Sequence, residues 1–247
     1  MSDALHESKQ RVVDFVSRYS MLTNSIVRIK DIGGADGVQK SIRALKDKGI
    51  LADDLLFVNG KIKFWALTKA AKKSGYIPPD LDPFIPGTGP KGDKYNIRNR
   101  YAIMMFCCGG PKQRTLLSRK EVKTLLGYEG QLRDGSMFYI DKYFQHITGQ
   151  ALLGHIMVDG GESTEQKIAE NIRNRAAALY DSDSPILRKL IEERLFILSY
   201  LCQSPGKATR IELALVKNKD AYPESGIWFN VCNIDKLQTT RQDGKRL

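Results

Sequence analysis

The chain has 247 residues, enough for one large domain or two modest ones, each with a buried core. Its hydrophobic fraction of 42% and charged fraction of 27% exclude an intrinsically disordered chain. Lys and Arg outnumber Asp and Glu by 39 to 28, so the formal net charge is +11. A positive charge of this size favours a polyanionic partner, nucleic acid before an anionic membrane surface.

The apolar runs and the cysteines indicate the cellular location of the protein. The longest apolar run, residues 101–108 (YAIMMFCC), is too short to span a bilayer, and the N-terminus is too polar for a signal peptide. Four cysteines, of which only Cys107 and Cys108 are neighbours, form neither a disulfide framework nor a CxxC zinc pattern. We therefore expect a soluble cytoplasmic protein with free thiols and no membrane partner.

A stretch rich in proline and glycine divides the chain. Residues 77–97 hold five of the nine prolines, interleaved with glycines, and show neither a helical nor a strand period. This composition predicts a linker or an extended arm between a first domain of residues 1–76 and a second domain of residues 98–247.

The first domain shows the pattern of three helices followed by a β-hairpin. Apolar residues recur at helical spacing over residues 12–19, 24–29 and 38–48, with Thr23-Asn24 as the expected N-cap of the second helix. Two strand patterns, LLFV and KIKFWALT, flank Asn59-Gly60, which is typical of a two-residue hairpin turn. Three helices and a hairpin in this order predict a winged helix.

In a winged helix the third helix enters the major groove and the hairpin lies near phosphates. The polar side chains expected to contact DNA are therefore those around the third helix and those on the hairpin: Gln39, Lys40, Arg43, Lys46, Lys61 and Lys63. Two other readings stay open. The basic residues can be a solvated helix face, and winged helices also serve as protein-docking modules.

The second domain alternates strands with helices. The expected elements are an amphipathic helix at 98–108, a polar loop, a helix at 119–126, two strand-like stretches about the Asp134-Gly135 turn, a buried strand ending at Asp159, helices at 163–179 and 186–193, a central strand within 194–204, a helix opened by Pro205, and a buried strand within 226–234. A strand–helix–strand order at these lengths implies a parallel pair with a crossover, and therefore an α/β domain.

Several catalytic signatures are missing from the sequence. No two of the three histidines (His6, His146 and His155) have the spacing of a zinc-binding motif, and no GxxxxGK[ST] loop is present. A phosphate-transfer enzyme built from this chain would have to use carboxylates and a hard cation.

Carboxylates occur where such a cation site needs them. Asp134 is expected at the start of one strand and Asp159 at the end of the next, while Glu162 and Glu165 open the following helix with Lys167 close behind. Two acidic groups on adjacent strand ends can hold Mg²⁺ or Mn²⁺, which would activate water. The alternative is structural, because Asp-Gly is a turn sequence and Glu in a first helical turn suits the helix dipole.

The segments LRDGSMFYID, HIMVDGGEST and FILSYLCQSPGKATRIELALV, with the final strand, resemble those of a known family. They are similar to the replication-relaxation family of plasmid proteins and the related MobC-type relaxases, which join a winged helix to a restriction-endonuclease-like PD-(D/E)xK domain. The resemblance implies that Asp134 and Asp159 are metal ligands, that Mg²⁺ or Mn²⁺ is the cofactor, and that one strand of a plasmid transfer or replication origin is nicked. It also suggests a coupling ATPase as a partner.

The chain departs from the family pattern at three points. Arg133 replaces the proline before Asp134, Met157 stands where the first acid of an acid-x-acid pair is expected, and no lysine follows an acid by two residues on that strand. Either Glu162 or Glu165 takes the place of the missing acid, or the nuclease site is degenerate and the protein only binds DNA.

A relaxase that conserves the energy of the cleaved bond needs a nucleophile, usually a tyrosine. Tyr19 at the end of the first helix is the candidate, with Tyr143 second; the alternative for Tyr19 is a core position.

The sequence thus predicts a metal-dependent DNA-nicking relaxase. The rival is a non-catalytic site-specific DNA-binding protein, either a repressor or a relaxosome accessory factor.

Overall fold

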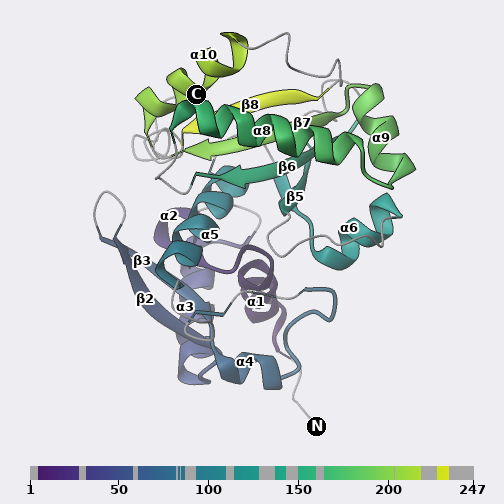
Figure 1. Ribbon diagram of the computed structural model, residues 1–247. Helices are drawn as coiled ribbons and strands as arrows, with labels where there is room; N and C mark the ends of the chain where they lie inside the picture. Colours follow the sequence, from purple (N-terminus) through teal and green to yellow (C-terminus); the bar gives the residue numbers. More distant parts are fainter. Residues whose placement is uncertain are drawn as a thin grey trace. The chain divides into compact units, whose positions relative to one another are not determined.

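The computed structural model of the protein describes residues 5–27, 32–57, 61–81, 83, 85–86, 93–109, 114–127, 137–142, 150–159, 164–202, 204–217 and 227–233. The chain is a mixed α/β protein that forms two compact units, Met1–Met104 and Met105–Leu247 (Figure 1). The boundary between the units falls downstream of the predicted linker 77–97. Residues 82, 84 and 87–92 of that stretch lie outside the described part, so the linker stays a prediction. Within the stretch, Ile85 is buried.

The first unit contains the predicted helices and hairpin. Its elements are α1 (Glu7–Tyr19), β1 (Leu22–Thr23), α2 (Asn24–Val27), α3 (Ala35–Asp47), β2 (Leu51–Phe57), β3 (Lys61–Leu67) and α4 (Lys69–Lys73). Strands β2 and β3 pair antiparallel with Phe57 opposite Lys61, and β1 adds to the other edge of β3. The predicted Asn59-Gly60 turn and Ile29 lie outside the described residues.

The helices of the first unit form because their apolar residues repeat at helical spacing. Val12, Val13 and Val16 of α1 are buried, and Val38 and Ile42 are buried on α3, which contacts α1. Helix α1 begins at the side chain of His6, whose Nδ1 accepts the backbone N–H of Ser8. The hairpin of β2 and β3 extends outward from these helices (Figure 1).

The second unit is built on a five-stranded sheet with the order β4-β5-β6-β7-β8. The strands are β4 (Arg114–Leu116), β5 (Met137–Asp141), β6 (Leu152–Val158), β7 (Phe196–Cys202) and β8 (Trp228–Asn233). The strands β4, β5 and β6 pair antiparallel, whereas β6, β7 and β8 pair in parallel. The expected parallel crossover is therefore confirmed.

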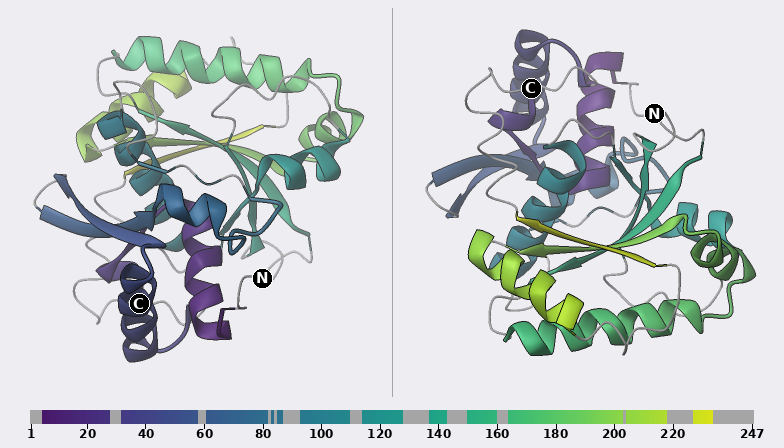
Figure 2. Two further views of the ribbon diagram at one scale, coloured as in Figure 1. Left: turned by 90° about the horizontal axis from the view of Figure 1, so that it is seen from below. Right: turned by 90° about the horizontal axis from the view of Figure 1, so that it is seen from above.

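Four helices bury one face of this sheet: α6 (Arg119–Leu126), α8 (Glu165–Tyr180), α9 (Pro185–Glu192) and α10 (Pro205–Lys217). Their apolar residues pack with Phe138, Leu153 and Leu198 of the sheet. Figure 2 shows α8 and α10 lying along the same side of the strands. Pro205 opens α10 as expected, since the first turn of a helix needs no proline N–H.

Three expectations for the second domain were wrong in detail. The helix expected at 98–108 is α5 (Asp93–Cys108), and residues 101–107 are all buried, so the second half of this helix is enclosed rather than amphipathic. The expected polar loop after it contains the edge strand β4. The final strand β8 is also an edge strand, and Trp228 is 57% exposed, because a strand with one neighbour is covered less than a central one.

Candidate functional site

Helix α3 presents a polar face opposite its buried stripe. Gln39, Lys40 and Arg43 are exposed on this face, and the side chain of Gln39 donates to Asn24 Oδ1 at 3.2 Å. Within the described residues, Lys40 and Arg43 form no ion pair. Their charges are therefore available to an external anion.

The hairpin carries the other predicted cations. Lys61 and Lys63 are exposed on β3. Lys63 Nζ lies 2.8 Å from Asp53 Oδ2 on β2, and Lys46 Nζ of α3 pairs with the second oxygen of the same carboxylate. These two contacts, that of Lys46 being the stronger, hold the pKa of Asp53 at about 2. Asp53 thus connects the end of α3 to the hairpin.

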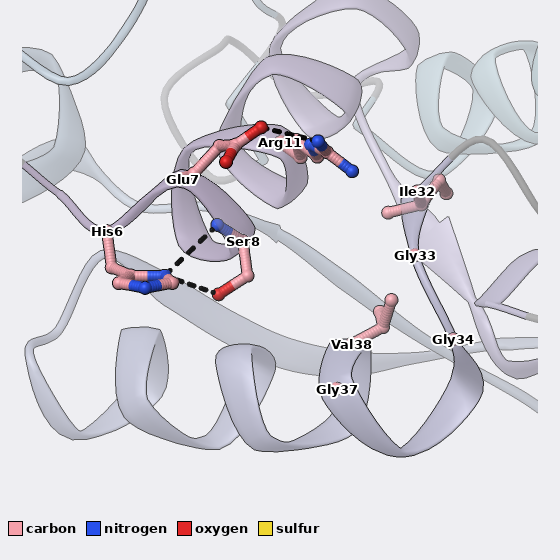
Figure 3. A pocket seen from close by; sticks show the side chains of 9 residues that line it. All are labelled: His6, Glu7, Ser8, Arg11, Ile32, Gly33, Gly34, Gly37 and Val38. Atoms are coloured by element: carbon pink, nitrogen blue, oxygen red, sulfur yellow. Dashed lines mark hydrogen bonds and ion pairs between the residues drawn. The ribbon is translucent and has the colours of Figure 1, made fainter.

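A hollow of about 210 Å³ lies between the first turns of α1 and α3 in the first unit (Figure 3). Its lining includes His6, Ser8 and the glycines Gly33, Gly34 and Gly37. In Figure 3 the Arg11 side chain bonds to Glu7, and the His6 ring bonds to Ser8. The charged groups here satisfy one another, and the hollow by itself indicates no ligand.

In the second unit, the predicted metal ligand Asp159 is buried directly after β6. Lys207 Nζ of α10 lies 2.7 Å from Asp159 Oδ2, and the Tyr200 hydroxyl of β7 donates to Oδ1 at 3.2 Å. The Asp159 backbone N–H donates to the carbonyl of Leu201. Helix α10 and two strands therefore meet at this carboxylate.

The other predicted residues of this site are arranged differently. Glu165, in the first turn of α8, accepts from Arg210 Nε at 2.8 Å, and this bond lowers the pKa of the Glu165 carboxyl. Lys167 is exposed on α8, and Lys207, not Lys167, pairs with Asp159. Asp134 and Glu162 lie outside the described residues.

The side chains around Asp159 do not form a cation site within the described part of the chain. An ammonium group already neutralises the carboxylate, and the neighbouring hydroxyl is a donor to it. No group of three His, Cys, Asp or Glu side chains among the described residues could hold a metal ion. The donors that are present fit an ion pair rather than Mg²⁺ or Mn²⁺.

The predicted nucleophile Tyr19 is buried at the end of α1, with 8% of its surface exposed. Its ring centroid lies 4.7 Å from that of Phe15. Burial against another ring favours the core position that the sequence left open. The second candidate, Tyr143, lies outside the described residues.

Three residues whose charged partners the structure shows were not singled out from the sequence. Lys207 lies in the basic helix after β7, but nothing in its spacing links it to Asp159. Asp53 is one of two adjacent aspartates on β2, and such a pair indicates only a solvent-exposed position. His155 is buried on β6, where burial and the neighbouring Arg175 lower its pKa to about 3. Such pairings depend on tertiary contacts that periodicity does not encode.

Comparison with protein-family models, curated proteins and solved structures found no match to this chain. None of the helices in the described ranges combines the length and the apolar character of a transmembrane span.

Proposed function

We propose that the first unit is a winged helix that binds duplex DNA, and that the chain is a site-specific DNA-binding protein. The observation that carries this proposal is the exposed face of α3, with Lys40 and Arg43, next to a hairpin whose strand β3 exposes Lys61 and Lys63. A helix fits the major groove, and lysines on a neighbouring hairpin can reach phosphates on its flank.

The charge of the whole chain supports the same partner. The formal net charge of +11 attracts polyanions, and phosphate contacts supply most of the affinity for non-specific duplex. Gln39, whose amide donates to Asn24 Oδ1 of α2, is of the side-chain type that reads adenine edges.

The test is DNA binding by the double variant Lys40→Ala with Arg43→Ala, measured by fluorescence anisotropy on a labelled duplex at several salt concentrations. Loss of two phosphate contacts should lower affinity and reduce the log–log salt slope by about 1.8. The matched control is Arg188→Ala with Lys189→Ala on α9, where both side chains are exposed and the change in net charge is the same. Equal effects of the two double variants would mean that α3 is not the contact surface.

A second function, single-strand nicking at a plasmid transfer or replication origin, is favoured by one observation. The buried Asp159 and Lys207 lie together after β6, near the first turns of α8 and α10. An acid and a lysine are the residue types of the PD-(D/E)xK signature that the sequence resembles, and Lys207 would supply the lysine that is missing from the strand. We propose this role for Asp159 and Lys207 together with Asp134.

Nicking of a supercoiled plasmid with and without EDTA tests this second function. Asp134→Asn and Asp159→Asn should each abolish nicking and leave duplex binding within a few-fold of the unmodified protein, because the proposed role needs both carboxylates and the variants change only the second unit. If both variants nick normally, the two carboxylates are not catalytic. An unmodified protein that binds but never nicks favours the non-catalytic role of repressor or accessory factor.

A further inference from the structure

The carboxylate of Asp53 lies between two of the cations proposed to contact DNA. Lys46 comes from the C-terminal part of α3 and Lys63 from the hairpin, and each pairs with a different oxygen of Asp53. The Asp53 side chain is 31% exposed, so solvent and solutes reach it. One anion therefore occupies the junction between the helix and the hairpin.

A DNA phosphate is chemically similar to this carboxylate, since its oxygens also accept hydrogen bonds from ammonium groups. We propose that Asp53 occupies, in the DNA-free protein, the position that a backbone phosphate takes between Lys46 and Lys63, so that DNA binding exchanges one anion for the other. This inference rests on the proposed DNA binding by the first unit.

The exchange makes Asp53 a residue that determines specificity. Lys40, Arg43 and Lys61 form no ion pair within the described residues and can attract any duplex. Lys46 and Lys63 contribute fully only where the path of the DNA brings a phosphate between α3 and the hairpin. Asp53 thus weakens binding to non-specific duplex more than binding to a fitted site.

A structural role of Asp53 predicts the opposite effect of its removal. If the carboxylate only fastened the hairpin to α3, its loss would loosen the surface and weaken binding. If it competes with phosphate, its loss frees two ammonium groups and strengthens binding. The sign of the change in affinity distinguishes the two roles.

The experiment compares Asp53→Asn with Asp54→Asn, using anisotropy of a labelled random-sequence duplex across a salt series. Asp54 is the exposed neighbour on the same strand, and its carboxylate accepts only the backbone N–H of Leu55 within the described residues. Both variants remove one negative charge. Asp53→Asn should bind about fivefold more tightly at low salt and steepen the salt slope by about 0.9, whereas Asp54→Asn should change affinity less than about twofold.

A second comparison tests whether Lys63 is the group that is freed. Lys63→Gln should weaken binding more in the Asp53→Asn background than in the unmodified protein, because only there is the ammonium group unshared. Thermal denaturation checks that each variant is folded. If Asp53→Asn does not fold, Asp53→Ser is used in its place.

Equal effects of Asp53→Asn and Asp54→Asn, or weaker binding by Asp53→Asn, would overturn the exchange. The proposed DNA binding would still stand if the Lys40 and Arg43 variant binds less than its α9 control. If neither the unmodified protein nor Asp53→Asn binds duplex, the proposed function fails and the exchange fails with it.

Discussion

Asp159 and Glu165 lie close in sequence and each pairs with a cation from α10, yet their surroundings differ. The Asp159 side chain is 4% exposed and that of its partner Lys207 is 13% exposed, whereas Arg210, the partner of Glu165, is 60% exposed. A buried charge that loses its partner cannot be rescued by water, and an exposed one can. Burial therefore decides how much each pair contributes to stability.

We predict that Lys207→Met destabilises the protein by about 3–5 kcal/mol, because it removes the ammonium group that pairs with the buried Asp159 carboxylate. Arg210→Met should have a much smaller effect. Urea denaturation of both variants measures the difference. Adding Asp159→Asn to Lys207→Met should recover much of the loss, and an unstable double variant would show that the methionine itself, rather than the buried negative charge, is responsible.

His155 gives the stability of the second unit a dependence on pH. Arg175 donates to His155 Nε2 at 2.8 Å, so the ring is a neutral acceptor, and its Nδ1 has no partner among the described residues. Burial first, and the charge of Arg175 second, lower the pKa of His155 from 6.5 to about 3. The unfolded chain therefore takes up a proton below pH 6.5 that the folded protein does not take up until about pH 3.

The expected result is a free energy of unfolding that falls as pH is lowered from 6.5 towards 3, with a contribution from His155 of up to about 1.4 kcal/mol per pH unit. His155→Gln keeps an acceptor for Arg175 but cannot be protonated, so its stability should fall less steeply. Denaturant titrations of both proteins across this pH range measure the slopes. Parallel slopes would show that His155 is not buried as a neutral ring.

At the scale of elements, the sheet of the second unit depends on one glycine in β6. Gly154 lies opposite Tyr139 of β5, and the Tyr139 ring covers the position of a Cβ atom at residue 154. The Tyr139 hydroxyl is 2.8 Å from Ser199 Oγ of β7, so the ring is held across β6 and cannot easily move aside. The Tyr139 side chain therefore spans three neighbouring strands on this face of the sheet.

Gly154→Ala should therefore destabilise the protein by about 1–3 kcal/mol, because the added methyl group overlaps the ring. Gly37→Ala in α3 is the matched control: its Cβ meets open space, and alanine favours a helix by about 0.5–1 kcal/mol. Thermal denaturation compares the two variants. In a Tyr139→Leu background the cost of Gly154→Ala should shrink, and an unchanged cost would place the strain elsewhere.

The elements that the sequence predicted well are those with a clear period or a clear end signal. Helix α6 (Arg119–Leu126) lies where the sequence predicts a helix, and in the structure Ser118 and Glu121 form a capping box at its start. The β4 strand was missed because three residues at a sheet edge carry no alternation to detect. The enclosure of α5 was missed because polar residues precede its apolar run, and only the packing decides which faces are covered.

Across the whole molecule, the sequence indicated a net positive charge, a first part of three helices and a hairpin, and a second part of the α/β class, but not the partners of the charged groups. The candidate residues on α3 and β3 are exposed, except Lys46, which is half-buried. The carboxylate at the end of β6 lies where the strand pattern predicted, yet it pairs with Lys207, which is far from it in sequence. Spacing locates a side chain on an element, whereas the neighbour that it meets depends on how distant elements pack.

The parallel pairing of β6, β7 and β8 has a consequence for the order in which the second unit can assemble. Antiparallel β5 and β6 pair across a short stretch of sequence, but β7 can join β6 only after α8 and α9 have been traversed, and β8 only after α10. Contacts between distant residues form slowly, because the intervening chain must be ordered first. During synthesis, β7 would emerge before β8 and wait with one backbone edge uncovered. The interval between these two strands is where we expect the nascent chain to be most prone to pairing with another molecule.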